Sequence, residues 1–214
     1  MRTVAFCEID PHARAVLHKH WPNVPVFTDV STLSKGDINE QIDIIAGGFP
    51  CQDISTAGRG AGLSGSRSGL WFEYCRLINE IRPRYAIIEN VSALRRRGLG
   101  GVLRSLAEIG YDAEWHCIPA SAIGAPHQRD RIWIVAYPNS TQREGRRLSS
   151  GAYAKYADAC SAGWWETEPA MDRVVNGVPG QAHRLKQLGN AVVPQIPELI
   201  GRTIMEYERA YSLA

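Results

Sequence analysis

The chain has 214 residues, which is enough for one domain with a sizeable core, or one domain and a small appendage. Its formal net charge is only +2, so any affinity for nucleic acid must come from local clusters of basic residues. The five cysteines are scattered, which argues against a disulfide framework and a zinc site. The N-terminus turns polar too early for a signal peptide, and no apolar run is long enough for a membrane span. These features predict a soluble intracellular protein.

Apolar periodicity predicts strands and helices that alternate along most of the chain. Short apolar, often β-branched runs predict strands, and apolar residues at helical spacing predict helices. The expected strands are 3–9, 26–30, 42–46, 85–88, 112–118 and 131–136, and the expected helices are 11–20, 70–81, 99–109 and a last one after Pro194. This alternation predicts an α/β fold with a parallel-dominated sheet. We expect residues 53–69, with five glycines, to form a loop.

The most informative stretch is Phe49-Pro50-Cys51-Gln52, which follows the apolar run 42–46 and two glycines that we expect to end that strand. Ligands and reactive groups of open α/β sheets collect at the carboxyl ends of the strands. A thiol on a proline-braced turn at that edge is typical of a positioned nucleophile. The alternative is a structural cysteine, because cysteine is among the most buried residue types.

Two further motifs carry charge next to predicted strands. Glu89 ends the strand 85–88, so it is expected at the same sheet edge as Cys51, where a thiol and a carboxylate can act as nucleophile and acid. Taken alone, Glu89 is equally a helix cap or a salt-bridge partner. Arg129 and Arg131 open the strand 131–136, and their spacing predicts that both side chains point the same way and hold an anion or a polar base edge. The alternative is a solvated basic edge.

Weaker signals lie near both ends of the chain. Gly189-Asn190 allows a tight turn, which needs no function before a helix. Glu8 and Asp29 each end a short early strand, where acidic residues suit the hydroxyls and amines of a bound nucleoside.

Taken together and in this order, FPCQ, ENV, QRDR and GNAVVP resemble the DNA cytosine-5 methyltransferase family. The resemblance covers residues 1 to about 137 and again about 184 to 205, and the stretch QDISTAGRGAGLSGSRSGLWF resembles the family's catalytic loop and following helix. Phage and prophage-type members are the most similar in the HRLKQLGNAVVPQI stretch. The resemblance implies a Rossmann-like methyltransferase sheet, S-adenosyl-L-methionine as cofactor, double-stranded DNA as partner, and a place in restriction-modification.

The resemblance also implies roles for individual residues. Cys51 would attack carbon 6 of a flipped cytosine, Glu89 would bind ring nitrogen 3 and the amine, and Arg131 would bind the carbonyl oxygen. Arg129 would support the loop, and both arginines would lower the pKa of the Cys51 thiol. The implied cofactor-binding residues are Glu8, Ile9, Asp29, Val30, Pro50, Leu70, Asn190 and Val192. The implied DNA-binding residues are Gln52, Ser55, Arg59 and Arg67.

The chain departs from the family pattern at its start. Members begin with a strand and an Asp-Leu-Phe-x-Gly-x-Gly-Gly type loop for the methionine part of the cofactor, and we find no such segment in residues 1–214. The absent strand would lie between the strands 3–9 and 42–46. We therefore expect an N-terminally truncated sheet that binds cofactor weakly by itself, as a monomer or with a complementing polypeptide.

The target-recognition region is the second departure, because it is short. We expect a catalytic core over 1–137, a recognition region over 138–185 and a C-terminal segment over 186–214 that returns to the core. The region contains Trp164, Trp165 and three arginines, Arg143, Arg146 and Arg147, which serve either DNA contact or ordinary packing and solvation.

Two hypotheses of different classes follow. The first is a DNA (cytosine-5-)-methyltransferase of the cytoplasm of a bacterial or phage-infected cell. The second is a catalytically silent DNA-binding remnant, or one half of a split enzyme. The retained cysteine, glutamate and arginines favour the first hypothesis, and the absent glycine-rich segment favours the second.

Overall fold

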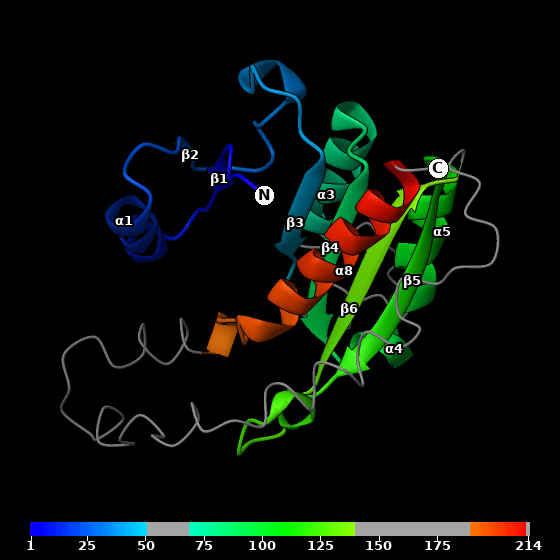
Figure 1. Cartoon of the computed structure of the whole chain (residues 1–214). Helices are drawn as coiled ribbons and strands as arrows, with labels where there is room; N and C mark the ends of the chain where they lie inside the picture. The colour runs from blue at the N-terminus through cyan, green and yellow to red at the C-terminus, as the bar shows by residue number, and fades with distance from the viewer. Residues whose placement is uncertain (51–68, 140–188, 213–214) are drawn as a thin grey trace, which may run out of the picture. The chain divides into compact units, whose positions relative to one another are not determined.

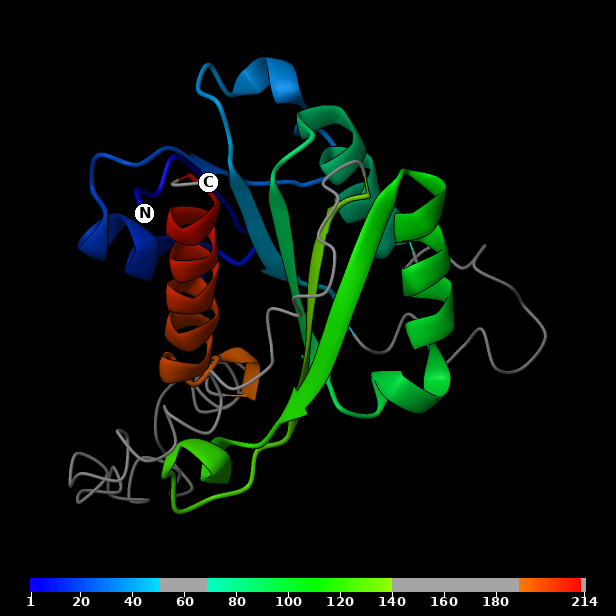
Figure 2. The same ribbon diagram turned by 45° about the vertical axis from the view of Figure 1, so that its right-hand side comes forward.

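The computed structural model of the protein describes residues 1–50, 69–139 and 189–212 (Figure 1). The described strands form two sheets. In the smaller sheet β1 (Phe6–Cys7) pairs in parallel with β2 (Val26–Phe27). The larger sheet consists, in order, of β3 (Ile44–Gly48), β4 (Tyr85–Val91), β6 (Arg131–Pro138) and β5 (Tyr111–Ile118), as Figure 2 shows.

The helices lie close to where periodicity predicts them. They are α1 (Pro11–His20), α3 (Gly69–Ile81), α4 (Leu94–Arg97), α5 (Leu99–Glu108) and α8 (Gln195–Ser212), with 3-10 turns η1 (Lys35–Asp37) and η3 (Ala120–Ile123). Asp10 caps α1 by accepting hydrogen bonds from the backbone N–H groups of His12 and Ala13, at 2.9 and 3.4 Å. None of the described helices is both long and apolar enough to cross a bilayer.

The chain divides into two compact units. The first comprises Met1–Cys117 and Arg131–Arg143, and contains both sheets with α1 and α3 to α5. The second comprises Ile118–Asp130 and Glu144–Ala214, and within it α8 packs on η3.

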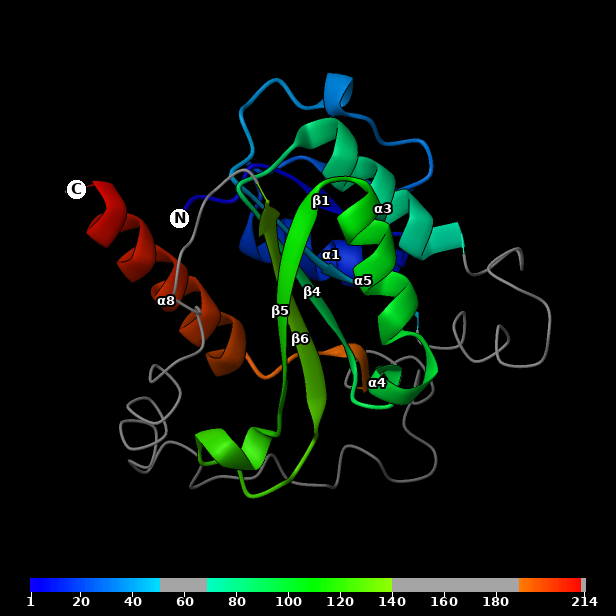
Figure 3. The ribbon, with the colours of Figure 1, turned by 90° about the vertical axis from the view of Figure 1, so that its right-hand side faces the viewer.

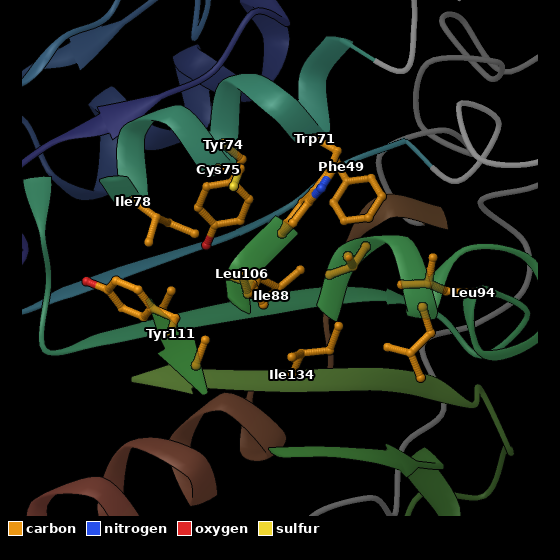
Figure 4. Packing of buried hydrophobic residues seen from close by; sticks show 14 of the residues in the cluster. Phe49, Trp71, Tyr74, Cys75, Ile78, Ile88, Leu94, Leu106, Tyr111 and Ile134 are labelled. Carbon is orange, nitrogen blue, oxygen red and sulfur yellow. The ribbon is translucent and has the colours of Figure 1, made fainter. Parts of the chain in front are cut away.

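The main core of the first unit lies between its four-stranded sheet and the two helices α3 and α5, which lie on the same side of the sheet (Figure 3). Figure 4 shows the buried side chains of this cluster, among them Phe49, Trp71, Tyr74, Ile88 and Leu106. The ring of Trp71 lies 5.2 Å from that of Phe49 and 6.1 Å from that of Tyr74, centroid to centroid. This aromatic group fixes the chain where it leaves β3.

A second, smaller cluster joins the N-terminal segment to α3. Leu33, Leu77 and Ile81 are buried there against partly buried neighbours that include Phe27 and Ile45. Arg76 of α3 adds polar contacts, because its guanidinium donates to the backbone carbonyls of Val30 and Leu33 at 3.0 and 2.9 Å. The segment after β2 is therefore held on the helix that covers β3.

The sheet is mixed, so the prediction of a parallel-dominated sheet is wrong for β6. β3 and β4 are parallel, but β4 and β6 are antiparallel. A parallel connection requires a crossover of about a dozen or more residues, usually a helix. The 119–130 connection between β5 and β6 contains only the short turn η3, so β6 returns directly beside β5.

The outer edge of β3 carries no strand among the described residues. β3 pairs with β4 alone, and β1 pairs with β2 in the separate sheet. The predicted strand 3–9 is only two residues long in the structure. Its one partner, β2, also has two residues and can form ladder hydrogen bonds with no more of the segment. The expected gap between these strands thus coincides with an open sheet edge.

Candidate active site

Glu89 and Arg131 form an ion pair on one face of the sheet, at the carboxyl end of β4. Glu89 lies opposite Trp133, and Val91 lies opposite Arg131, so the two charged residues are diagonal neighbours across the antiparallel pair. The Arg131 Nε atom is 3.0 Å from the Glu89 Oε1 atom, and each side chain is 20% exposed. The pair combines a carboxylate acceptor and a guanidinium donor that a planar polar ligand can reach from solvent.

Gly48 makes room for the Glu89 carboxylate. The two residues are register partners in β3 and β4. A methyl group on Gly48 would lie 3.0 Å from both the backbone O and the Oε2 atom of Glu89, closer than ordinary van der Waals contact. Gly47 and Gly48 are the last two residues of β3, so the strand ends at the glycines as predicted but starts and ends two residues later than the expected range 42–46. Gly48 is a site residue that sequence reasoning missed, since its role depends on strand register.

Asn90 holds the backbone that leads to the predicted nucleophile. It is 4% exposed, and its Nδ2 atom donates to the carbonyl oxygen of Phe49 at 2.9 Å. Its Oδ1 atom accepts from the backbone N–H of Val91 at 2.9 Å. Cys51 itself lies outside the described residues, but two residues span at most about 7 Å. The Asn90 bond therefore sets where the chain starts toward Cys51, next to the Glu89 strand.

Trp133 is a second residue near the ion pair that sequence reasoning missed. It is 5% exposed and lies directly opposite Glu89 in the register. Among the described residues its buried indole Nε1 atom has no hydrogen-bond partner. A large apolar ring with a donor thus borders the carboxylate.

Two of the described cysteines, Cys7 and Cys75, are poor nucleophiles. Burial raises the pKa of the Cys75 thiol, with the Glu108 carboxylate adding to the shift. Partial burial likewise raises the pKa of the Cys7 thiol, and the Asp29 and Glu8 carboxylates raise it further. Because the thiolate is the reactive form of cysteine, neither side chain is activated.

Arg129 does not lie in the strand that it was expected to open. β6 begins at Arg131, and the backbone φ of Arg129 is 31°, which an extended strand cannot contain. The argument from strand alternation is therefore wrong for Arg129. Within the second unit its Nη2 atom donates to the carbonyl oxygens of Gly189, at 2.8 Å, and of Ala191. Arg129 thus fixes the segment that contains Asn190, where the structure has helical residues at Gly189 and Asn190 in place of the predicted tight turn.

Glu8 and Asp29 meet at one end of the β1–β2 pair. The parallel register aligns Cys7 with Phe27, so the two acidic residues both follow the carboxyl ends of paired strands. Glu8 accepts from the backbone N–H of Asp10 at 2.7 Å. Hydrogen bonds from the Ser31 hydroxyl and backbone N–H hold the pKa of Asp29 below its usual value. Two carboxylates at one strand end suit ligand hydroxyl and amine donors.

The other predicted cofactor residues are mostly exposed. Ile9 is 74% exposed beside Glu8, and Val30 is partly buried beside Asp29. Pro50 and Leu70 are exposed in the first unit, and Asn190 and Val192 are exposed in the second. The predicted nucleophile and DNA contacts, Cys51, Gln52, Ser55, Arg59 and Arg67, lie outside the described residues, as does the recognition region from residue 140 onward.

The model of the C-5 cytosine-specific DNA methylase family matches residues 1–174. The chain belongs to this family. Type II methyltransferase M.CviJI of Paramecium bursaria Chlorella virus IL3A is 33% identical over 192 residues, which are 89% of this chain and 50% of the viral protein. Type II methyltransferase M2.BsuMI of Bacillus subtilis (strain 168) is 37% identical over 142 residues, 63% of this chain and 36% of the relative.

Solved structures agree with the family assignment. A prophage-encoded protein of E. coli, described as a DNA modification methyltransferase, is 27% identical with a TM-score of 0.55, over 65% of this chain and 41% of its own. S. pombe Dnmt2 methyltransferase, at 18% identity and a TM-score of 0.56, shares the fold over 72% of this chain and 46% of its own. The predicted Rossmann-like methyltransferase fold is confirmed. The chain spans about half the length, or less, of the methylase relatives that it matches.

Proposed function

We propose that this methylase transfers a methyl group from S-adenosyl-L-methionine to carbon 5 of a flipped cytosine in double-stranded DNA. The observation that carries the proposal is the Glu89–Arg131 pair, 3.0 Å apart, at the strand end beside which the chain leaves β3 toward Cys51. The Asn90 bond to Phe49 ties these two strand ends together. The site would act in the cytoplasm of a bacterial or phage-infected cell.

In this proposal each side chain has a distinct task. The Cys51 thiolate adds to carbon 6, which gives carbon 5 enamine character, and later leaves when carbon 5 loses its proton. Glu89 binds ring nitrogen 3 and the exocyclic amine, while Arg131 donates to the carbonyl oxygen, so the adduct's charge is stabilised. The resemblance to the family gives Arg129 a role in supporting the catalytic loop, and a guanidinium close to the thiol would favour the thiolate. A flipped base costs a few kcal/mol of unstacking, which the pocket must return.

The residues at the end of the β1–β2 pair fit the cofactor. Glu8 would bind the ribose hydroxyls and Asp29 the adenine amine, since both carboxylates face the same strand end. The Ser31 hydrogen bonds that lower the pKa of Asp29 favour its ionised, acceptor form. The resemblance to the family also gives cofactor-binding roles to Pro50 and Leu70 and, separately, to Asn190 and Val192. When bound, S-adenosyl-L-methionine supplies the electrophilic methyl group.

Transfer of labelled methyl groups to duplex DNA tests the proposal. We expect Cys51→Ser and Glu89→Gln to abolish incorporation. Cys117→Ser, a substitution of a partly buried thiol in β5, serves as the matched control and should retain it. Equal incorporation by the Cys51→Ser variant and the control would refute the assignment of the nucleophile.

The alternative is a silent DNA-binding remnant or one half of a split enzyme, and it bears on the outer edge of β3, which no described strand covers. The Asp43 carbonyl oxygen accepts from Tyr85 N–H at 3.0 Å, so the N–H groups of Ile45 and Gly47 also face β4, and those of Ile44 and Ala46 face the open edge. Hydrogen exchange should therefore be slow at Ile45 and fast at Ile44 and Ala46. Full protection of all of them in the isolated chain would remove this alternative.

A further inference from the structure

We propose that Arg95, Arg96 and Arg97 form a docking site for DNA phosphates beside the active site. This inference rests on the proposed function and adds a second contact surface for the same DNA. It concerns residues that neither the family motifs nor the predicted DNA contacts include. The three arginines make up most of α4. Two residues separate the start of this helix from Val91, the last residue of β4.

The arginine triplet is exposed on the part of the chain that the structure describes. All three side chains are exposed, and among the described residues no hydrogen bond or ion pair involves their guanidinium groups. Two other arginines of the first unit are ion-paired: the exposed Arg2 with Glu40, and the partly buried Arg76 with Glu73 and Glu80. Residues 90–107 contain four arginines and no acidic residue, whereas the whole chain has a formal charge of +2. The local field here is therefore much more positive than the average.

The backbone that presents the triplet is fixed on both sides. Leu94 is fully buried and Leu99 is 6% exposed, and both belong to the main core cluster. The N–H groups of Arg95 and Arg96 donate to the carbonyl oxygens of Ser92 and Ala93, each at 3.1 Å. Three cations on an anchored turn lose little backbone freedom when they bind an anion, which favours a binding surface over a solvated tail.

A structural role does not require three arginines here. Basic residues in the last turn of a helix offset the partial negative charge of its C-terminus, but that effect is confined to the final turn and is screened by salt. α4 has only one turn, so a single cation would serve. Like charges side by side also repel one another, which disfavours the triplet unless an anion lies nearby.

The chain length between Glu89 and Arg95 sets an upper limit on the distance from the triplet to the ion pair. Figure 3 shows α4 beyond the carboxyl end of β4, the same end that carries Glu89. Six residues separate Glu89 from Arg95, so their Cα atoms are at most about 20 Å apart. Duplex DNA carries one charge per about 1.7 Å of axis, or about twelve charges over that length. A duplex that delivers a base to Glu89 therefore brings several phosphates within reach of the triplet.

The test is the salt dependence of binding to a labelled 30-base-pair duplex, measured by fluorescence anisotropy on residues 1–214. Each phosphate contact contributes about −0.9 to the slope of log K against log[salt]. The R95Q/R96Q/R97Q variant should have a slope that is less steep by up to about 2.7. Between roughly 50 and 200 mM salt, the affinity of the wild-type protein should therefore fall about 40-fold more than the affinity of this variant. The R95K/R96K/R97K variant keeps the charge and should keep the slope.

A matched control removes a charge from the other end of the same strand. Arg84 is exposed just before β4, and R84Q should leave the slope unchanged. A glutamine triple variant with the wild-type slope would overturn the docking site, and so would an equal loss in the lysine triple variant or R84Q. Methyl transfer by wild-type protein is measured separately, so a failure of the proposed function is recognised independently of the slope.

Discussion

The Gly48→Ala substitution tests whether strand register creates the space for the Glu89 carboxylate. The added methyl group would lie 3.0 Å from the backbone O and from the Oε2 atom of Glu89. One of these atoms belongs to the β4 backbone and cannot rotate away, so the strands or the carboxylate must shift by a few tenths of an ångström. Overpacking of this kind typically costs about 1–3 kcal/mol.

Gly47→Ala provides the matched control one residue earlier in β3. There the methyl group would meet the Tyr74 ring at 3.7 Å, which is ordinary contact. A tolerated glycine-to-alanine change stabilises a protein by about 0.4–1 kcal/mol through the unfolded chain. Both variants share this gain, so Gly48→Ala should be less stable than Gly47→Ala by about 1–3 kcal/mol.

Urea unfolding followed by tryptophan fluorescence measures the difference in stability. Methyl transfer to DNA provides a second measurement, because a misplacement of about 1 Å at a catalytic group can reduce the rate by about 100-fold. We expect a smaller displacement here and a reduction of about tenfold for Gly48→Ala relative to Gly47→Ala. Equal stability and equal rates in the two variants would refute the argument from register.

Three further experiments test the contacts around the site. Asn90→Ala should lower the free energy of unfolding by about 1–3 kcal/mol, because the buried Phe49 carbonyl loses its donor; unfolding in urea measures it, and an unchanged midpoint would contradict the clamp. Burial raises the pKa of the Tyr74 hydroxyl, so the unfolded chain ionises first, and stability should fall as pH rises above about 10. Tyr74→Phe should remove part of that fall, and an identical pH profile would contradict this role. A double-mutant cycle of Glu89→Gln and Arg131→Gln should give a coupling of about 1 kcal/mol, and additive effects would mean that the 3.0 Å pair contributes no stability.

Local chemistry allowed most of the fold to be predicted from the sequence. The Asp10-Pro11 start predicts the helix that the structure places at Pro11–His20, because cap and first turn lie within a few residues. Strand lengths were less predictable, because a strand extends only as far as its partner does. The expected strand 3–9 is shorter in the structure, Phe6–Cys7. The expected strand 85–88 is longer, Tyr85–Val91, because it has a neighbouring strand on each side.

Some features of the candidate site follow from local sequence, and others depend on how the strands pair. The position of Glu89 at a strand end follows from the apolar run before it, and its approach to Arg131 follows from alternation once the strands are antiparallel. The roles of Gly48 and Asn90 depend on which residues face each other, information that no single segment contains. Arg129 departs from its strand because one positive φ ends the alternation, and the Asp130-Arg131 context does not signal it.

Acidic and basic residues are concentrated in different regions of the chain, so the formal net charge does not indicate which ligands the protein binds. Residues 1–50 contain six acidic and four basic side chains, histidines aside, and two of those carboxylates, Glu8 and Asp29, are close enough to raise the pKa of Cys7. Residues 90–107 contain four arginines and no acid. These two regions flank the carboxyl ends of different strands, so one end would attract a sulfonium cofactor and the other a polyanion. The formal charge of +2 results because the charges of the acidic and the basic region largely cancel. The acidic region matches the proposed sulfonium cofactor, and the basic region matches the proposed DNA.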